Sequence, residues 1–209
     1  MPRVARTDGQ RVASAGNEPG AVLSLSARRD DSSAGLRSHD GAVRGPVAVL
    51  GVDASLTRSA FAILDTDGNQ YHEVITTRAD WPLPRRLRAL ADAAYRISTE
   101  HLPLALVVIE EPGFVRAQHG VGPITALCRA QGAIMAGLPS ALTVEAVMVS
   151  RMRSVLQVKI PRGKGAAKPA ILEFVEARGI TVPRLRGGSH DDDVADAYLA
   201  ACYALARLA

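Results

Sequence analysis

The residues best suited to chemistry are carboxylates from distant parts of the chain. Asp53 ends one apolar run and Glu110 ends another, while Asp193 and Asp196 lie three residues apart in the last apolar segment. Carboxylates that converge repel one another, which raises their pKa values unless a cation neutralises them. Hard divalent cations prefer oxygen ligands, and the sequence offers no competing His and Cys cluster, so the set favours Mg²⁺ or Mn²⁺. Two such ions can hold the attacking water and the leaving oxygen of a phosphodiester.

Each acidic residue also has an ordinary structural explanation. Aspartates at a helix start accept free N–H groups and complement the helix dipole, which by itself accounts for Asp191 and Asp192. An aspartate at the end of a strand is often a turn residue. Asp196 fits this explanation least, because it lies past the first helical turn, between Ala195 and Ala197, where a lone buried charge is costly.

The elements that would position these carboxylates follow from hydrophobic periodicity. Apolar or alternating runs predict strands at residues 47–53, 59–65, 70–77, 104–111 and 141–147. Helical patterns cover residues 81–102, 122–137, 149–156 and 167–178, and a last helix starts near Asp191. A hairpin signal at Asp67-Gly68 makes the first three strands an antiparallel meander, and the helix after them lets the fourth strand lie parallel to the first. The order indicates an α/β fold: a mixed five-stranded sheet with helices on its faces.

This topology brings the acidic residues together. Parallel neighbours end on the same side of a sheet, where open sheets usually build their sites, so Asp53 and Glu110 are expected side by side. Asp193 and Asp196 share one helix face because they are three residues apart.

Length and composition fit a single globular domain. The chain has 209 residues, 47% of them hydrophobic, and a formal net charge of +4, which permits a polyanionic partner without requiring one. No apolar run approaches the roughly 20 residues of a membrane span, so we expect no membrane association and a cytoplasmic location. Cys128 and Cys202 lack a metal-binding spacing, and both are expected to be small buried hydrophobes in a reducing compartment.

Residues 1–45 differ from the rest of the chain. They are rich in Gly, Ser, Ala, Arg and Asp and have no sustained apolar period, so they cannot bury enough surface to offset chain entropy. We expect a disordered tail followed by one folded domain over residues 46–209. Deletion of the tail is expected to leave folding and activity intact.

Several segments resemble the RuvC family of Holliday junction resolvases, in the RNase H-like superfamily. The matching segments are VLGVDASLTRSAFAIL in the first strand and turn, VVIEE in the fourth strand, LCRAQGAIMA in the helix after it, GKGAAKPAI in a basic loop and DVADAYLAAC in the last helix. They occur in the family's order and span about residues 47–204. The resemblance implies an RNase H-like sheet of three antiparallel strands followed by two parallel ones, with helices on both faces.

The resemblance also implies a metal-dependent nuclease. It places Asp53, Glu110, Asp193 and Asp196 in a tetrad that holds two Mg²⁺ ions, with Mn²⁺ as the alternative, and adds Lys168 as a catalytic residue beside the scissile phosphate. The implied activity is that of a crossover junction endodeoxyribonuclease. Such an enzyme resolves Holliday junctions or related branched DNA by paired nicking, in recombination and repair.

Three choices within the acidic set stay open. Glu111 falls where many relatives carry glutamine, so Glu110 is preferred and Glu111 is the fallback. Asp192 is four residues from Asp196 and could face the same way, which makes it an alternative to Asp193. His190 is either a nearby ligand or proton carrier or, as we expect, a solvated helix-cap residue.

A run of basic residues would supply the counter-charge that DNA needs beside a carboxylate-lined site. Residues 151–168 contain six basic side chains and no acid, and an ordinary solvated face is the alternative explanation. The resemblance maps Arg153 and Lys168 onto basic residues near the scissile phosphate. The residues expected to bind DNA are Arg153, Lys159, Arg162, Lys164, Lys168 and Phe114.

Phe114 and the helix after it carry the remaining expectations. Phe114 follows EEPG, and its ring could stack on an unpaired base at a junction or simply pack in the core. The resemblance implies a homodimer, since a symmetric junction needs two matched cuts. Residues 124–136, rich in small side chains, could form its interface or pack on the sheet.

Two rival functions remain. The actin and sugar-kinase ATPases also begin with a strand, an aspartate and a small-residue turn, but this chain shows neither their second phosphate loop nor their Gly-rich adenine site. A non-catalytic branched-DNA-binding protein of the RNase H-like fold is the other, and the complete tetrad argues against it.

Overall fold

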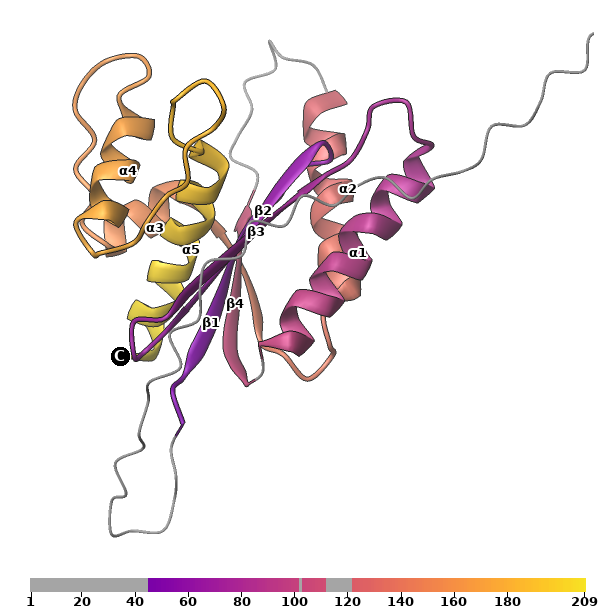
Figure 1. Cartoon of the computed structure of the whole chain (residues 1–209), viewed down its shortest axis with the longest axis horizontal. Helices are drawn as coiled ribbons and strands as arrows, with labels where there is room; N and C mark the ends of the chain where they lie inside the picture. Colours follow the sequence, from indigo (N-terminus) through magenta and orange to yellow (C-terminus); the bar gives the residue numbers. More distant parts are fainter. Residues whose placement is uncertain (1–44, 102, 112–121) are drawn as a thin grey trace, which may run out of the picture.

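The computed structural model describes residues 45–101, 103–111 and 122–209. Phe114 and, apart from Gly45, the expected tail lie outside the described residues. The strands are β1 (Ala48–Asp53), β2 (Arg58–Asp65), β3 (Gln70–Thr76), β4 (Leu104–Glu111) and β5 (Val144–Met148). They form one sheet in the order β3-β2-β1-β4-β5, antiparallel among the first three and parallel from β1 to β4 to β5, as the sequence predicted (Figure 1).

Several strand ends differ from the predicted ones by one residue, and the start of β5 differs by more. β2 begins at Arg58, one residue early, because Arg58 still pairs with Thr76 of β3. β5 begins three residues late, because a turn closed by the Leu142 N–H and the Pro139 carbonyl (3.0 Å) occupies the start of the predicted range.

Helices cover both faces of the sheet. The helices are α1 (Leu83–Glu100), α2 (Gly122–Gly137), α3 (Val149–Val155), α4 (Ala167–Glu176) and α5 (Asp192–Leu208). α1 and α2 pack on one face, α5 lies along β1, β2 and β4 on the other, and α3 and α4 lie against α5 (Figure 1). The sheet therefore has a separate apolar core on each side.

A close approach between α5 and β1 fixes where α5 lies. Of the eleven α5 residues from Val194 to Ala204, all except Asp196 are buried, and five of the buried ones are alanine. A Cβ atom on Gly51 would collide with the backbone of Ala197 and Ala201. Because Gly51 has no Cβ, the α5 backbone can lie directly on β1, beside the end of the strand that carries Asp53.

The structure also tests two expectations from composition. None of the helices formed by residues 45–101, 103–111 and 122–209 has the length and hydropathy that crossing a bilayer requires. Cys202 is buried as predicted, but Cys128 is exposed, so that prediction was wrong. The buried positions of α2 are Ala130 and Ile134, and Cys128 lies two residues before Ala130, on the far side of the helix.

Candidate active site

Asp53 and Glu110 lie at the carboxyl ends of the neighbouring strands β1 and β4, on the same face of the sheet. In β1, Val49 belongs to the α5-side core and Val52 to the opposite core, so Asp53 continues the α5-facing series. In β4, Val108 faces α5, so Glu110 does as well. The register pairs Val52 with Ile109, which sets the two carboxylates at adjacent strand ends.

The same alternation separates Glu110 from Glu111. Ile109 belongs to the core under α1 and α2, and Glu111 shares its face, away from α5. Glu111 is also exposed, whereas Glu110 is half-buried. The placement favours Glu110 over Glu111 as the acidic residue of this site.

α5 adds two more carboxylates, and the electrostatics show that they are close. Burial, and then the charges of Glu110, Asp196 and Asp193, raise the pKa of Asp53 to about 8. Burial, and then Glu110, raise the pKa of Asp196 to about 7. Burial also raises the pKa of Glu110. These shifts are the signature of negative charges gathered where water cannot separate them.

The site was tested for its fit to a metal ion. In residues 45–101, 103–111 and 122–209, no three His, Cys, Asp or Glu side chains are arranged to hold an ion as they stand. Asp192 and Asp193 are instead engaged in ion pairs with Lys168 and Arg58. The donor chemistry nevertheless fits a hard divalent cation, because the gathered groups are all carboxylates and a cation would relieve their repulsion.

Asp192 and Asp193 point to different partners. Asp192 accepts from the Lys168 ammonium, with Nζ and Oδ2 2.7 Å apart. Asp193 accepts from the Arg58 guanidinium. Asp193 is among the charges that raise the pKa of Asp53, whereas both Asp192 and Asp193 raise the pKa of Asp196. The coupling to Asp53 favours Asp193 as the third member of the acidic set.

Asp191 and His190, just before α5, have structural partners. Asp191 is the N-cap of α5 and accepts from the Val194 N–H (3.4 Å), as predicted for a capping residue. His190 was expected to be solvated, but its side chain is only 17% exposed. Its Nδ1 lies 3.1 Å from the Glu176 carboxylate without the geometry of a hydrogen bond. A solvated cap role for His190 was therefore wrong.

Two of the predicted basic residues reach the acidic set. Lys168, in the first turn of α4, lowers the pKa of both Asp53 and Asp196. Arg153, on α3, lowers the pKa of Glu110, and its Nε donates to the Val149 carbonyl (3.3 Å). Their positive charges lie at the carboxylates, where a phosphate would otherwise be repelled.

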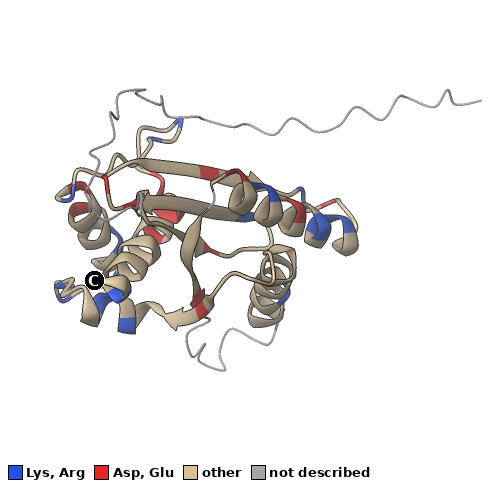
Figure 2. Cartoon of the chain, turned by 90° about the horizontal axis from the view of Figure 1, so that it is seen from below, with Lys and Arg blue, Asp and Glu red and all other residues tan. Residues whose placement is uncertain are grey.

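The other three lie in the loop between α3 and α4. Lys159, Arg162 and Lys164 are all exposed. α3 ends in a left-handed residue, Gln157 (φ 57°), and the Val158 N–H donates back to the Arg153 carbonyl (2.9 Å), a motif that turns the chain sharply out of the helix. Figure 2 shows acidic and basic positions interspersed along the helices and loops, with further acidic positions on the strands.

Sequence analysis missed Arg58. It is two residues before Ala60, which faces α5 and pairs with Asp53, so Arg58 faces α5 from just beyond the end of β1. The signal that could have found it is the alternation of β2 side chains between the two faces of the sheet. This alternation begins at Arg58, one residue earlier than the predicted strand.

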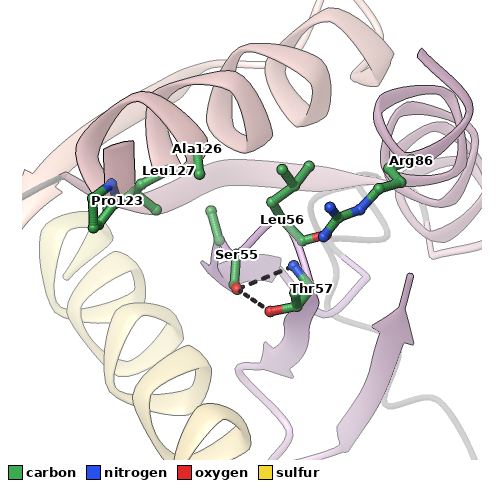
Figure 3. Close-up of a pocket in the computed structure, with 8 residues that line it drawn as sticks. Ser55, Leu56, Thr57, Arg86, Pro123, Ala126 and Leu127 are labelled. Atoms are coloured by element: carbon green, nitrogen blue, oxygen red, sulfur yellow. Dashed lines mark hydrogen bonds between the residues drawn. The ribbon is translucent and has the colours of Figure 1, made fainter. Parts of the chain in front are cut away.

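A separate cavity of about 460 Å³ lies beside the turn after β1. It is lined by Ala54, Ser55, Leu56, Thr57, Arg86, Pro123, Ala126 and Leu127, and none of the carboxylates lines it (Figure 3). Arg86 donates from Nε to Thr77 Oγ1 (2.9 Å) and from Nη2 to the Leu56 carbonyl (3.0 Å). Arg86 thereby braces the turn that follows Asp53.

Comparison with known proteins gives partial sequence matches. No protein-family model matches the chain. Over 70 residues it is 31% identical to a Rhodopseudomonas palustris protein named crossover junction endodeoxyribonuclease RuvC, which covers 32% of this chain and 40% of the relative. Over 93 residues it is 32% identical to the protein of that name from Afipia carboxidovorans, covering 43% and 52%. The chain thus matches about half the length of these relatives, or less.

Solved structures share the fold over most of the described chain. Thermus thermophilus RuvC in complex with a Holliday junction substrate superposes with a TM-score of 0.57 at 19% identity, covering 78% of this chain and 94% of that one. A second Thermus thermophilus RuvC structure gives 0.56 at 17% identity, covering 78% and 95%. The chain therefore has the RNase H-like fold and resembles RuvC in sequence and architecture.

Proposed function

We propose that this RuvC-like chain is a divalent-metal-dependent endonuclease that cuts branched DNA, and four-way junctions above all. The observation that carries the proposal is the convergence of Asp53, Glu110 and Asp196, whose burial and mutual repulsion raise the pKa values of Asp53 and Asp196. A stable protein has no reason to bury three unpaired carboxylates together unless a cation or a substrate compensates them.

Four residues would hold the metal: Asp53, Glu110, Asp193 and Asp196. When bound there, a pair of Mg²⁺ ions, or Mn²⁺ in their place, supplies a lowered pKa for an attacking water and charge neutralisation for a phosphodiester. The carboxylates belong to three rigid elements, β1, β4 and α5, so the protein fixes their separation before DNA arrives.

Basic residues at the rim complete the site. Lys168 is more than half exposed and its ammonium is held by Asp192, so it can reach a phosphate oxygen without leaving the acidic set. Arg153 stands on the Glu110 side. Lys159, Arg162 and Lys164 extend the positive charge away from the carboxylates, along the path a DNA backbone would follow.

The substrate class is inferred from the relatives. Two partial relatives are named crossover junction endodeoxyribonuclease, and the fold matches a RuvC bound to a Holliday junction. A two-fold homodimer would place two such sites on one junction and cut both strands. α2 offers a surface for that contact, because only Ala130 and Ile134 of it are buried while Met135 is 46% exposed.

A nicking assay tests the proposal. Purified protein is incubated with a synthetic four-way junction, a flap and a linear duplex, in Mg²⁺, in Mn²⁺ and in EDTA. We expect metal-dependent cuts in the junction, and none by Asp53→Asn or Asp196→Asn. Both variants should bind the junction with near-normal affinity, since neither residue belongs to the basic rim.

The same assay decides between the rivals. Tight junction binding with no cleavage in either metal would identify a non-catalytic DNA-binding protein. Wild-type cutting by Asp53→Asn would refute the assignment of the site. ATP hydrolysis without cleavage would point instead to a phosphoryl-transfer enzyme of the actin-like type.

A further inference from the structure

Arg58 ties together two aspartates that flank the start of α5. Its Nη1 donates to Asp191 Oδ1 (2.9 Å) and also to Asp193, and its Nη2 donates to Asp191 Oδ2. One guanidinium therefore bonds a capping residue and a candidate metal ligand at once. Arg58 belongs to β2, so these contacts also fasten the start of α5 to the sheet.

The two aspartates are held in different ways. Both oxygens of Asp191 are engaged, since Oδ1 accepts from Arg58 and from the Val194 N–H and Oδ2 accepts from Arg58. The Asp191 side chain is only 5% exposed. Asp191 is an anchor that cannot turn toward an ion without leaving the half-buried Arg58 guanidinium and the start of α5 without their partner.

Asp193 has one oxygen to spare. Arg58 engages its Oδ2, and among residues 45–101, 103–111 and 122–209 no donor is recorded for Oδ1. Its charge helps raise the pKa of Asp53, so the Asp193 carboxylate is electrostatically coupled to the acidic set. When one oxygen of a carboxylate is held by a hydrogen bond, the other oxygen can point in only a few directions. Residues around metal sites orient ligating carboxylates in this way, although they do not touch the metal themselves.

We infer that Arg58 is a positioning residue of the active site: braced on Asp191, it holds Asp193 by one oxygen so that the other faces the space shared with Asp53 and Asp196. This inference rests on the proposed metal site and adds to it a residue that itself touches neither metal nor DNA. The fork geometry is essential, because a lysine ammonium cannot bond both Asp191 oxygens in parallel and still reach Asp193.

The experiment measures Mn²⁺ binding to the full chain, by electron paramagnetic resonance titration, without reference to cleavage. Arg58→Gln is expected to weaken the tighter Mn²⁺ site by roughly 10–100-fold, the usual effect of losing an outer partner of a ligand. Arg58→Lys should restore part of that loss but not all of it. Arg78→Gln is the matched control and should bind Mn²⁺ normally, because Arg78 is exposed and its guanidinium bonds to the nearby Asp80, away from the acidic set.

Each outcome is decisive. If the wild type binds no Mn²⁺, the proposed metal site itself fails. If the wild type binds and Arg58→Gln binds equally well or more tightly while its melting temperature falls, Arg58 is only a structural clamp and the inference is overturned. If Arg58→Gln does not fold, Arg58→Lys decides the question: wild-type affinity in that variant contradicts the inference, and a several-fold loss supports it.

Discussion

At the scale of single residues, Asp53 is a carboxyl group whose pKa is strongly raised by burial and by neighbouring negative charges. Its pKa in the folded chain is about 8, against 3.8 for an ordinary aspartate. A carboxyl group whose pKa is raised on folding takes up a proton as the chain folds. Its stabilising effect is complete at low pH and is lost as the pH rises toward the folded-state pKa. The metal-free protein should therefore lose stability between about pH 4 and pH 8.

This gives the first prediction. Asp53→Asn removes the titrating charge at nearly constant volume, so in EDTA at pH 8 the variant should be more stable than the wild type by up to about 5 kcal/mol. Below about pH 3 the difference should vanish, because Asp53 is then largely neutral in both the folded and the unfolded wild type. Thermal denaturation across this pH range measures it. Equal melting temperatures of the two proteins at pH 8 would show that Asp53 is not under strain.

Some residues near the acidic set could be predicted from the sequence, and others could not. Asp53, Glu110 and Asp196 were predictable, since each ends or interrupts an apolar run. Arg58 was not, because its role depends on α5 folding back across the sheet to bring Asp191 beside it, a contact between residues 133 apart in sequence. Asp192 and Asp193 could be told apart only once Lys168 and Arg58 had been placed in space.

At the scale of elements, the packing of α5 on β1 governs the site. Gly51→Ala is the second prediction: its Cβ would meet the backbone of Ala197 and Ala201, so α5 must move away from β1. We expect a loss of at least 1–3 kcal/mol, as for overpacked cores, and weaker metal binding. Chemical denaturation and Mn²⁺ titration are the measurements.

A matched substitution controls for the loss of glycine itself. Gly132 lies in the middle of α2, and a Cβ there would meet nothing within 4 Å. Gly132→Ala should leave stability unchanged or raise it by up to about 1 kcal/mol. If both alanine variants behave alike, close packing of α5 is not what Gly51 provides.

The loop between α3 and α4 carries the third prediction. Lys164→Gln in this exposed loop should weaken junction binding and reduce the slope of log affinity against log salt by up to about 0.9, the value for one phosphate contact. The turnover rate of bound substrate should stay the same. Lys168→Gln should do the opposite, with slower cleavage and a smaller change in affinity, because Lys168 lies at the carboxylates. Affinity measured at several salt concentrations separates the two.

Hydrophobic periodicity predicted the elements well but not their ends. The five strands, their order and the parallel pairing of β1 with β4 follow from apolar runs and from the helix between them. The start of β5 depends on a turn at Pro139, and the exposure of Cys128 depends on which side of α2 faces the sheet. Neither feature can be recognised from the spacing of apolar residues nearby.

At the scale of the whole molecule, the outer face of α2 is available for a second copy of the chain. The fourth prediction is that Met135→Glu, which places a charge on this face, yields a monomer by light scattering and turns paired cuts into single nicks. Tyr95→Glu, at an even more exposed position on α1, is the control and should leave the assembly unchanged. If the Met135→Glu protein is still a dimer, the interface lies on a surface other than the outer face of α2.

The position of α5 in the chain order has a further consequence. Its carboxylates come from an element that is made after β1 and β4, the strands that carry Asp53 and Glu110. On the proposed function, a nascent chain that has made only the sheet and its first helices possesses no cutting centre. The order of synthesis would then delay any cleavage until α5 has docked on the sheet.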